Sequence, residues 1–129
     1  MIRNGCVSFL VAVALAACGR GGAAATLDAP IQLAPGESAV FDAEHLQVKF
    51  VGIDSDSRCP SDVACVWAGE VLVRLTLRKD GRTKELGIKE TQTLPVNGYS
   101  VTVLQVLPAR KSSQPIPPAD YRVTLKLTR

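Results

Sequence analysis

Two stretches of the chain alternate apolar with polar residues, and this pattern constrains the fold more than any other feature of the sequence. They are segment 71–78, VLVRLTLR, and segment 121–128, YRVTLKLT. A period of two places every second side chain on the same face of a strand, so each segment is expected to bury one face and expose the other. Both segments are therefore predicted to be half-buried β-strands.

Five further segments have the composition of strands. They are 31–33, 39–41, 46–53, 83–89 and 99–107. The alternation in segment 46–53 shifts near Gly52, which predicts a change of register there. Apolar residues occupy both faces of segment 99–107, so this strand is expected to be central and covered on both sides. Its first face carries Tyr99, Val101, Val103 and Leu107, and its second face carries Leu104 and Val106.

Tight turns separate the predicted strands, and no segment keeps a helical period. Asp80-Gly81 lies between two alternating runs and indicates a hairpin, because glycine accepts the positive φ of such turns. Pro35-Gly36 and Asn97-Gly98 indicate two more turns. The sequence thus predicts an all-β domain over residues 30–129, an immunoglobulin-like β-sandwich of about seven strands, with a small β-barrel as the alternative.

Residues 1–17 have the form of an export signal. Arg3 precedes an apolar run of about 12 residues, too short for a membrane span of about 20. The run ends in Leu15-Ala16-Ala17-Cys18, which resembles the lipobox of bacterial lipoproteins. The resemblance implies cleavage before Cys18, a diacylglycerol on its thiol and acylation, such as with palmitate, of the new amine. An ordinary secretory signal cut at an A-x-A site is the alternative.

Segment 18–29 is rich in glycine and alanine and is predicted to be a lipidated N-terminus followed by a flexible tether. The chain is therefore expected to be held on a membrane of the cell envelope. Gly19 rather than aspartate follows Cys18. By resemblance to Gram-negative lipoproteins, this favours the outer membrane, facing the periplasm, if the organism is Gram-negative.

The charged residues give no indication of a nucleic-acid partner or of catalysis. The formal net charge is +3, and the charges of both signs are interspersed. His45 is the only histidine, and the sequence carries no nucleophile elbow, P-loop or dinucleotide fingerprint. Neither an enzyme nor a bound cofactor is expected.

Segment 54–70, DSDSRCPSDVACVWAGE, is the unusual part of the chain. It holds Cys59, Cys65 and the only tryptophan, Trp67. An exported chain enters an oxidising compartment, so the two cysteines are predicted to form a disulfide. Ser61 between them is a candidate cap for a short helical turn.

Part of this segment resembles a pattern shared by small uncharacterised bacterial secreted proteins and lipoproteins. The pattern is Asp-Ser-Arg-Cys-Pro, a second cysteine and then Trp-x-Gly, represented here by residues 56–60 and 65–69. Gly98-Tyr99 and Tyr121 are also similar in placement. The resemblance covers most of residues 30–129 and implies a fold and a location, but no activity.

Two interpretations of the segment concern packing and binding. In the structural interpretation, the disulfide staples a long crossover, Trp67 plugs the end of the sandwich, and Arg58 pairs with Asp56 or Asp62. In the binding interpretation, a rigid loop at the end of the sandwich presents Arg58 and part of Trp67 to a partner, with Asp56 and Asp62 beside them.

Two other interpretations concern chemistry. Carboxylate oxygens are calcium ligands, and the weak candidates for such a site are Asp54, Asp56, Asp62 and Glu70. A redox-active cysteine pair is the last interpretation, although the spacing is C-x5-C and not C-x-x-C.

The sequence favours a non-catalytic interaction module of the cell envelope that contacts an envelope protein through segment 54–70. The alternative is a ligand-binding, calcium-binding or inhibitory lipoprotein that uses the same loop. Strand edges are a further place where a partner can add, by β-augmentation.

Overall fold

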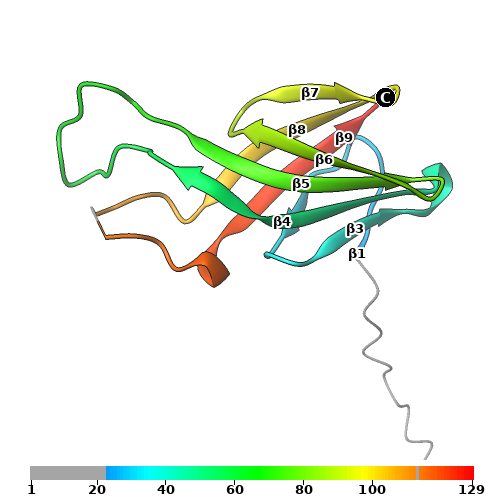
Figure 1. The fold of residues 1–129 in the computed structure, drawn as a ribbon, viewed down its shortest axis with the longest axis horizontal. Helices are drawn as coiled ribbons and strands as arrows, with labels where there is room; N and C mark the ends of the chain where they lie inside the picture. The colour runs from blue at the N-terminus through cyan, green and yellow to red at the C-terminus, as the bar shows by residue number, and fades with distance from the viewer. Residues whose placement is uncertain (1–22, 113) are drawn as a thin grey trace, which may run out of the picture.

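The computed structural model describes residues 23–112 and 114–129. Within them the chain folds into two packed β-sheets, so the predicted all-β sandwich with immunoglobulin-like architecture is confirmed (Figure 1). The predicted signal peptide and Cys18 lie outside these residues. None of the helical turns in the described part of the chain has the length and apolarity of a membrane span.

The strands form one sheet of five and one of four among the described residues. The first sheet has the order β1 (Ala23–Ala24), β3 (Ser38–Phe41), β4 (Leu46–Asp56), β5 (Val71–Lys79) and β6 (Arg82–Lys89). The second has the order β2 (Ile31–Leu33), β9 (Arg122–Thr128), β8 (Tyr99–Leu107) and β7 (Thr93–Val96). Two 3-10 turns, η1 (Asp42–Glu44) and η2 (Pro118–Asp120), precede β4 and β9.

The core lies between the inner faces of the two sheets, as the alternating pattern predicts. The inward residues of β5 and β9 are fully buried, and the buried aromatic side chains Phe41 and Phe50 lie among them. The buried residues of these two strands are Val71, Val73, Leu75, Leu77, Val123, Leu125 and Leu127. Burial of about 25 cal/mol per Å² of apolar surface is the main force that holds such a sandwich together.

The predicted coverage of β8 on both faces is wrong. β8 lies inside its sheet, but Leu104 is exposed, Val106 is buried and Leu107 is half-buried. The cause is a register shift between Val103 and Gln105 in the pairing with β9. One extra residue reverses the alternation, so Val106 joins the inner face and Leu104 turns to solvent.

β4 carries the register change that the sequence predicts near Gly52. Its pairing with β5 shifts between Phe50 and Gly52, and again between Ile53 and Ser55. β3 pairs with β4 only as far as Lys49, whereas β4 continues to Asp56. The end of β4 therefore extends beyond its neighbour and brings Asp56 to one end of the sandwich (Figure 1).

The prediction of a flexible tether up to Ala29 is wrong from Ala23 onward. Ala23 and Ala24 pair in parallel with Ala39 and Val40 of β3. Ala25 and Leu27 pack against the core, and the backbone N–H of Asp28 donates to the carbonyl of Leu127 at 2.9 Å. Backbone pairing and the packing of Leu27 against the core thus order this segment, although its composition alone predicts a flexible tether.

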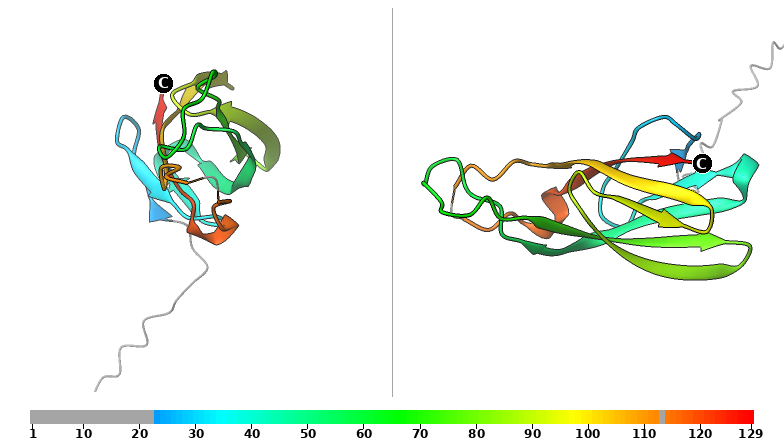
Figure 2. Two further views of the ribbon diagram at one scale, coloured as in Figure 1. Left: turned by 90° about the vertical axis from the view of Figure 1, so that its left-hand side faces the viewer. Right: turned by 90° about the horizontal axis from the view of Figure 1, so that it is seen from above.

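The connection between β4 and β5, loop 57–70, extends from one end of the molecule (Figure 2). The described residues of the segment before η2, 108–112 and 114–117, lie beside this loop at the same end and are called segment 108–117 below. The hairpin between β5 and β6 and the C-terminus lie at the opposite end, and β1 is nearer to that end.

Candidate functional site

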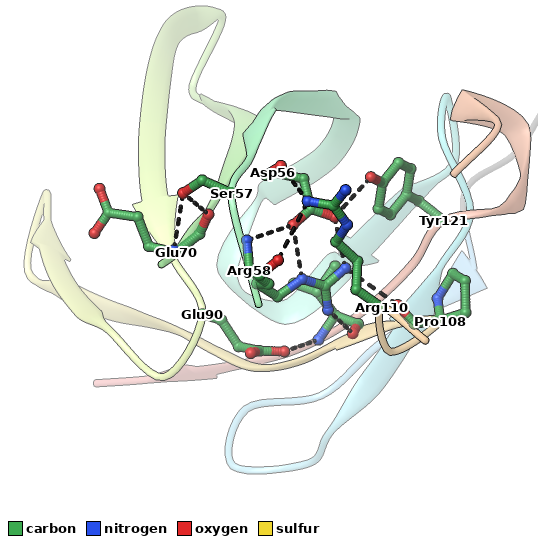
Figure 3. A network of polar contacts seen from close by, with 9 residues as sticks. Asp56, Ser57, Arg58, Glu70, Glu90, Pro108, Arg110 and Tyr121 are labelled. Carbon is green, nitrogen blue, oxygen red and sulfur yellow. Dashed lines mark hydrogen bonds and ion pairs between the residues drawn. The ribbon is translucent and has the colours of Figure 1, made fainter. Parts of the chain in front are cut away.

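A partly buried ion pair holds the start of loop 57–70. Arg58 Nε donates to Asp56 Oδ1 at 2.9 Å, and Arg58 Nη2 donates to Asp56 Oδ2 at 2.8 Å (Figure 3). The side chains are 14% and 9% exposed, respectively. Two parallel bonds between a guanidinium and a carboxylate fix both distance and orientation. The predicted pairing of Arg58 with Asp56 is therefore confirmed.

Arg58 also reaches across to the second sheet. Its Nη1 donates to the carbonyl of Val106 at 3.0 Å, and its Nη2 donates to the carbonyl of Pro108 at 3.1 Å. The backbone N–H of Val106 in turn donates to Glu90 Oε2 at 2.6 Å. The guanidinium thus fastens the loop to the end of β8, and it does not face solvent as a contact residue.

Tyr121 and Arg110 complete this polar network. Tyr121 Oη donates to Asp56 Oδ2 at 2.8 Å. Arg110 Nη1 donates to the carbonyls of Asp56 and Arg58, at 3.3 Å and 3.2 Å (Figure 3). We call the side chains of Asp56, Arg58, Arg110 and Tyr121 the latch, because they join loop 57–70 to segments of both sheets.

The electrostatics of the latch follow from its burial. Burial would raise the pKa of Asp56, but hydrogen bonds from Arg58 and Tyr121 outweigh it, and the pKa is lowered. The hydrogen bond to Asp56 raises the pKa of Arg58 against the opposing effect of burial. Burial, and then the bond to Asp56, raises the pKa of Tyr121 to about 12. At neutral pH the latch therefore holds one anion, its cations and a neutral phenol.

Backbone contacts close the base of the loop. The Ser57 N–H and hydroxyl donate to the carbonyl of Glu70 at 2.8 Å and 3.0 Å, and the Glu70 N–H donates to Ser57 Oγ at 3.0 Å. The Cys59 N–H donates to the carbonyl of Ala68 at 3.1 Å. These bonds give the loop a strand-like stem ahead of its tip.

Gly69 permits this stem to close. Its φ is +68°, and a Cβ at this position would lie 1.8 Å from the carbonyl oxygen of Ser57. Only glycine fits such an approach. Glycine is thus required at this position of the Trp-x-Gly pattern because the stem of the loop leaves no room for a side chain. The requirement does not come from the tip.

The predicted disulfide is present between Cys59 and Cys65, with their Cα atoms 6.0 Å apart. Ser61 lies in a turn between them, and not in a helix, so its predicted role as a helix cap is wrong. Its N–H donates to the carbonyl of Arg110 at 3.0 Å, and its hydroxyl donates to that of Lys111 at 3.3 Å. Contact with segment 108–117 therefore takes the place of a helical turn.

The tip of the loop is apolar and exposed. Val66 is 92% exposed and Trp67 is 83% exposed, and Val63 and Asp62 beside them are also exposed. The prediction that Trp67 plugs the end of the sandwich is wrong. The latch closes that end instead and leaves the indole outside.

The four carboxylates considered for calcium do not converge. Asp54 pairs with Arg74 at 3.1 Å, Asp56 with Arg58, and Glu70 with Lys89 at 3.0 Å. The described residues contain no cluster of three or more potential metal ligands. Three of these carboxylates thus balance separate cations, which leaves the predicted calcium site without a geometric basis.

The binding candidates divide into two groups. Trp67 and Asp62 are at the exposed tip, whereas Arg58 and Asp56 belong to the latch, so the prediction that Arg58 is presented to a partner is wrong. Tyr121 and Arg110 were not predicted to belong to the site. Their contacts with Asp56 span more than fifty positions, and no local sequence pattern reports such pairings.

No protein-family model, curated protein or solved structure matches the chain in the three comparisons made.

Proposed function

We propose that this protein is a lipid-anchored lipoprotein of the cell envelope, and that it acts as a non-catalytic interaction module. Its contact with an envelope protein is the tip of loop 57–70, centred on Val66 and Trp67. The observation that carries the proposal is an almost fully exposed Trp67 on a loop whose stem is fixed by the latch.

The energetics of binding support this role for the tip. Tryptophan is among the residues that contribute most to protein interfaces. A loop that is ordered before binding loses little conformational entropy when it docks. The tip projects from the end of the domain, which suits a partner with a concave apolar site (Figure 2).

The lipobox supports the anchor, and the position of β1 sets how close the domain would lie to it. Four residues, 19–22, separate Cys18 from Ala23 at the start of β1. Five Cα-to-Cα steps span at most about 18 Å. A lipid on Cys18 would therefore hold the sandwich next to the membrane surface, with loop 57–70 projecting from the end farther from β1.

The state of the titratable groups supports a non-catalytic role. Asp56, Arg58 and Tyr121 satisfy one another, and burial and hydrogen bonding favour the charged carboxylate and the neutral phenol. His45 is exposed at the turn that precedes β4. This arrangement supports a structural role for these groups.

A photo-crosslinking experiment in living cells tests the contact. A photoreactive amino acid replaces Val66 at the tip, and the control chain carries it at Thr83, which is exposed on β6. We expect one discrete adduct from position 66 and none from position 83. The adduct should disappear when Trp67→Ala is added. Equal labelling at both positions, or no adduct at position 66, would contradict the proposed contact.

The anchor is tested separately with Cys18→Ala. We expect the wild-type chain to fractionate with membranes and to carry a covalent lipid by intact mass, and the variant to become soluble. A variant that stays membrane-bound would contradict the lipid anchor. It would not affect the result of crosslinking at position 66.

A further inference from the structure

The distal half of β4 has an edge that no strand of the described residues covers. β3 pairs with Leu46–Lys49, and Phe50 makes the last two backbone bonds on that side, with Gly36 and Glu37. Residues 51–55 continue past this point: Gly52, Ile53 and Ser55 pair with β5 on the other side, and Val51 and Asp54 fall at the two register shifts. Figure 1 shows this end of β4 running beyond β3.

A groove of about 550 Å³ runs beside this edge. Val51, Gly52 and Ile53 line one side, and Ile116, Pro118 and Ala119, from the segment before β9, line the other. Tyr121 and Asp56, already bonded to each other, also contribute to the lining. Its volume is within the range of about 300–1,000 Å³ found for ligand sites.

The outer edges of the two described sheets carry charges, proline or short strands that discourage strand addition, whereas this edge carries two register shifts instead. β6 exposes Arg82, Lys84 and Glu85, β7 contains Pro95, and β1 and β2 are two and three residues long. Charges, proline and short length are the usual means by which proteins protect an edge. Residues 51–53 are valine, glycine and isoleucine, and Val51 is 42% exposed.

We propose that this groove binds an extended peptide segment of a partner protein, which adds to β4 as a short antiparallel or parallel strand along residues 51–55. Backbone N–H and C=O groups on an open edge are satisfied by another extended backbone, and alternate side chains of that strand would face the apolar lining. This site is separate from the tip of loop 57–70 and does not depend on the function proposed above.

The lining restricts the chemistry of the segment. Its two charged residues, Asp54 and Asp56, are already paired with Arg74 and Arg58, so the segment is expected to face the groove with uncharged side chains. The two register shifts in this half of β4 increase its twist. They restrict the added strand to a short run, and the paired residues are expected to be those between Val51 and Ser55.

The test uses the full chain and a panel of synthetic hexapeptides that alternate valine with threonine and end in lysine, acetylated and amidated at their termini. Each peptide has a counterpart with alternate backbone nitrogens methylated, which removes donors without changing the side chains. Amide hydrogen exchange reports whether the backbone of residues 51–55 becomes protected. We expect protection to increase at least about tenfold at saturating peptide, and the methylated peptides to give none.

Two matched lysine substitutions locate the site. Val51→Lys places a charge on the open edge at an exposed position, and we expect it to weaken peptide binding by at least about tenfold. Thr83→Lys on the exposed side of β6 is the control and should leave binding within a factor of about two. Trp67→Ala should bind the peptides as the wild type does. A negative result in this test therefore leaves the proposed contact at the tip unaffected, and a negative crosslinking result leaves the groove unaffected.

Three results would overturn the proposal. Methylated and unmethylated peptides that bind equally would show side-chain docking without strand addition. If hexanol displaces the peptides, and peptide binding itself does not change the amide exchange of residues 51–55, the groove binds small apolar groups and not an added strand. If no peptide of the panel binds at millimolar concentration, the proposal that this edge accepts an added strand is wrong.

Discussion

Tyr121 Oη donates a hydrogen bond of 2.8 Å to Asp56 Oδ2, across 65 positions of sequence. Asp56 is the last residue of β4 in one sheet, and Tyr121 directly precedes β9 in the other. The same carboxylate receives both guanidinium bonds of Arg58. One partly buried anion thus fixes the relation between the two sheets and the direction in which loop 57–70 leaves the domain.

Removing this anion should destabilise the fold. We expect Asp56→Ala to lower the free energy of unfolding by about 3 kcal/mol, because it leaves a partly buried guanidinium without its counter-charge. The measurement is urea denaturation monitored by circular dichroism.

The same strand provides a matched control. Asp54 also pairs with an arginine, Arg74, but these side chains are 33% and 47% exposed. Asp54→Ala should therefore cost less than about 1 kcal/mol, as exposed ion pairs do. Equal losses for the two variants would show that the latch contributes no more than a surface pair.

Gly69 should be less replaceable than another glycine with positive φ. Gly69→Ala would place a Cβ 1.8 Å from the carbonyl oxygen of Ser57, whereas a Cβ at Gly36, with φ of +86°, would meet no atom within 4 Å. Gly36→Ala should cost only the conformational penalty of about 1–2 kcal/mol. Gly69→Ala should cost more, and it should also speed hydrogen exchange at the Cys59 amide, which closes the stem. A Cys59 amide with unchanged protection would contradict the steric reason for Gly69.

Tyr121 should give the protein a characteristic alkaline response. Its folded-state pKa of about 12 lies above the ordinary value of 10.0, so the fold favours the neutral phenol. That contribution to stability is fully present below pH 10 and is lost as the pH rises through about 12.

Two measurements on wild type and Tyr121→Phe check this response. The difference in absorbance at the tyrosinate band should show one phenol that titrates near pH 12. The difference in unfolding free energy between the two chains should be constant below pH 10 and should shrink above it. A Tyr121 titration centred at pH 10 would mean that neither burial nor the bond to Asp56 raises the pKa of this phenol.

The exposure of Trp67 has a direct spectroscopic consequence. It is the only tryptophan, so the fluorescence of the chain reports this one side chain. We expect acrylamide to quench the native protein with about the efficiency seen in urea, because 83% exposure leaves the indole accessible before unfolding. Quenching that rises several-fold on unfolding would indicate a buried indole and would remove the basis of the proposed contact.

The strands and the core could be predicted from sequence because their signal is local. The alternation in segments 71–78 and 121–128 reports directly which side chains are buried. β1 and β7 carry no such signal: β1 is two alanines, and β7 contains a proline. Their pairing is decided by the neighbouring strands β3 and β8.

The site could be predicted only in part, because its decisive contacts are between distant segments. The disulfide and the Asp56–Arg58 pair join residues six and two positions apart, and both were predicted. The sequence leaves two interpretations of Trp67 open, a buried plug and a residue presented to a partner, because tryptophan is buried on average and only the contacts of the latch show that the end of the sandwich is closed without it.

The pairing of β1 with β3 determines how the protein would respond to mechanical load. If a lipid holds Cys18 while a partner pulls on Trp67, tension passes through the two paired residues of β1 before it reaches the longer strands. β1 would peel away first, and detachment of residues 23–30 would free a segment with a contour length of about 26 Å while breaking the core contacts of Ala25 and Leu27. The anchor side would then act as an extensible spacer that lets the domain follow a moving partner while the longer strands stay paired.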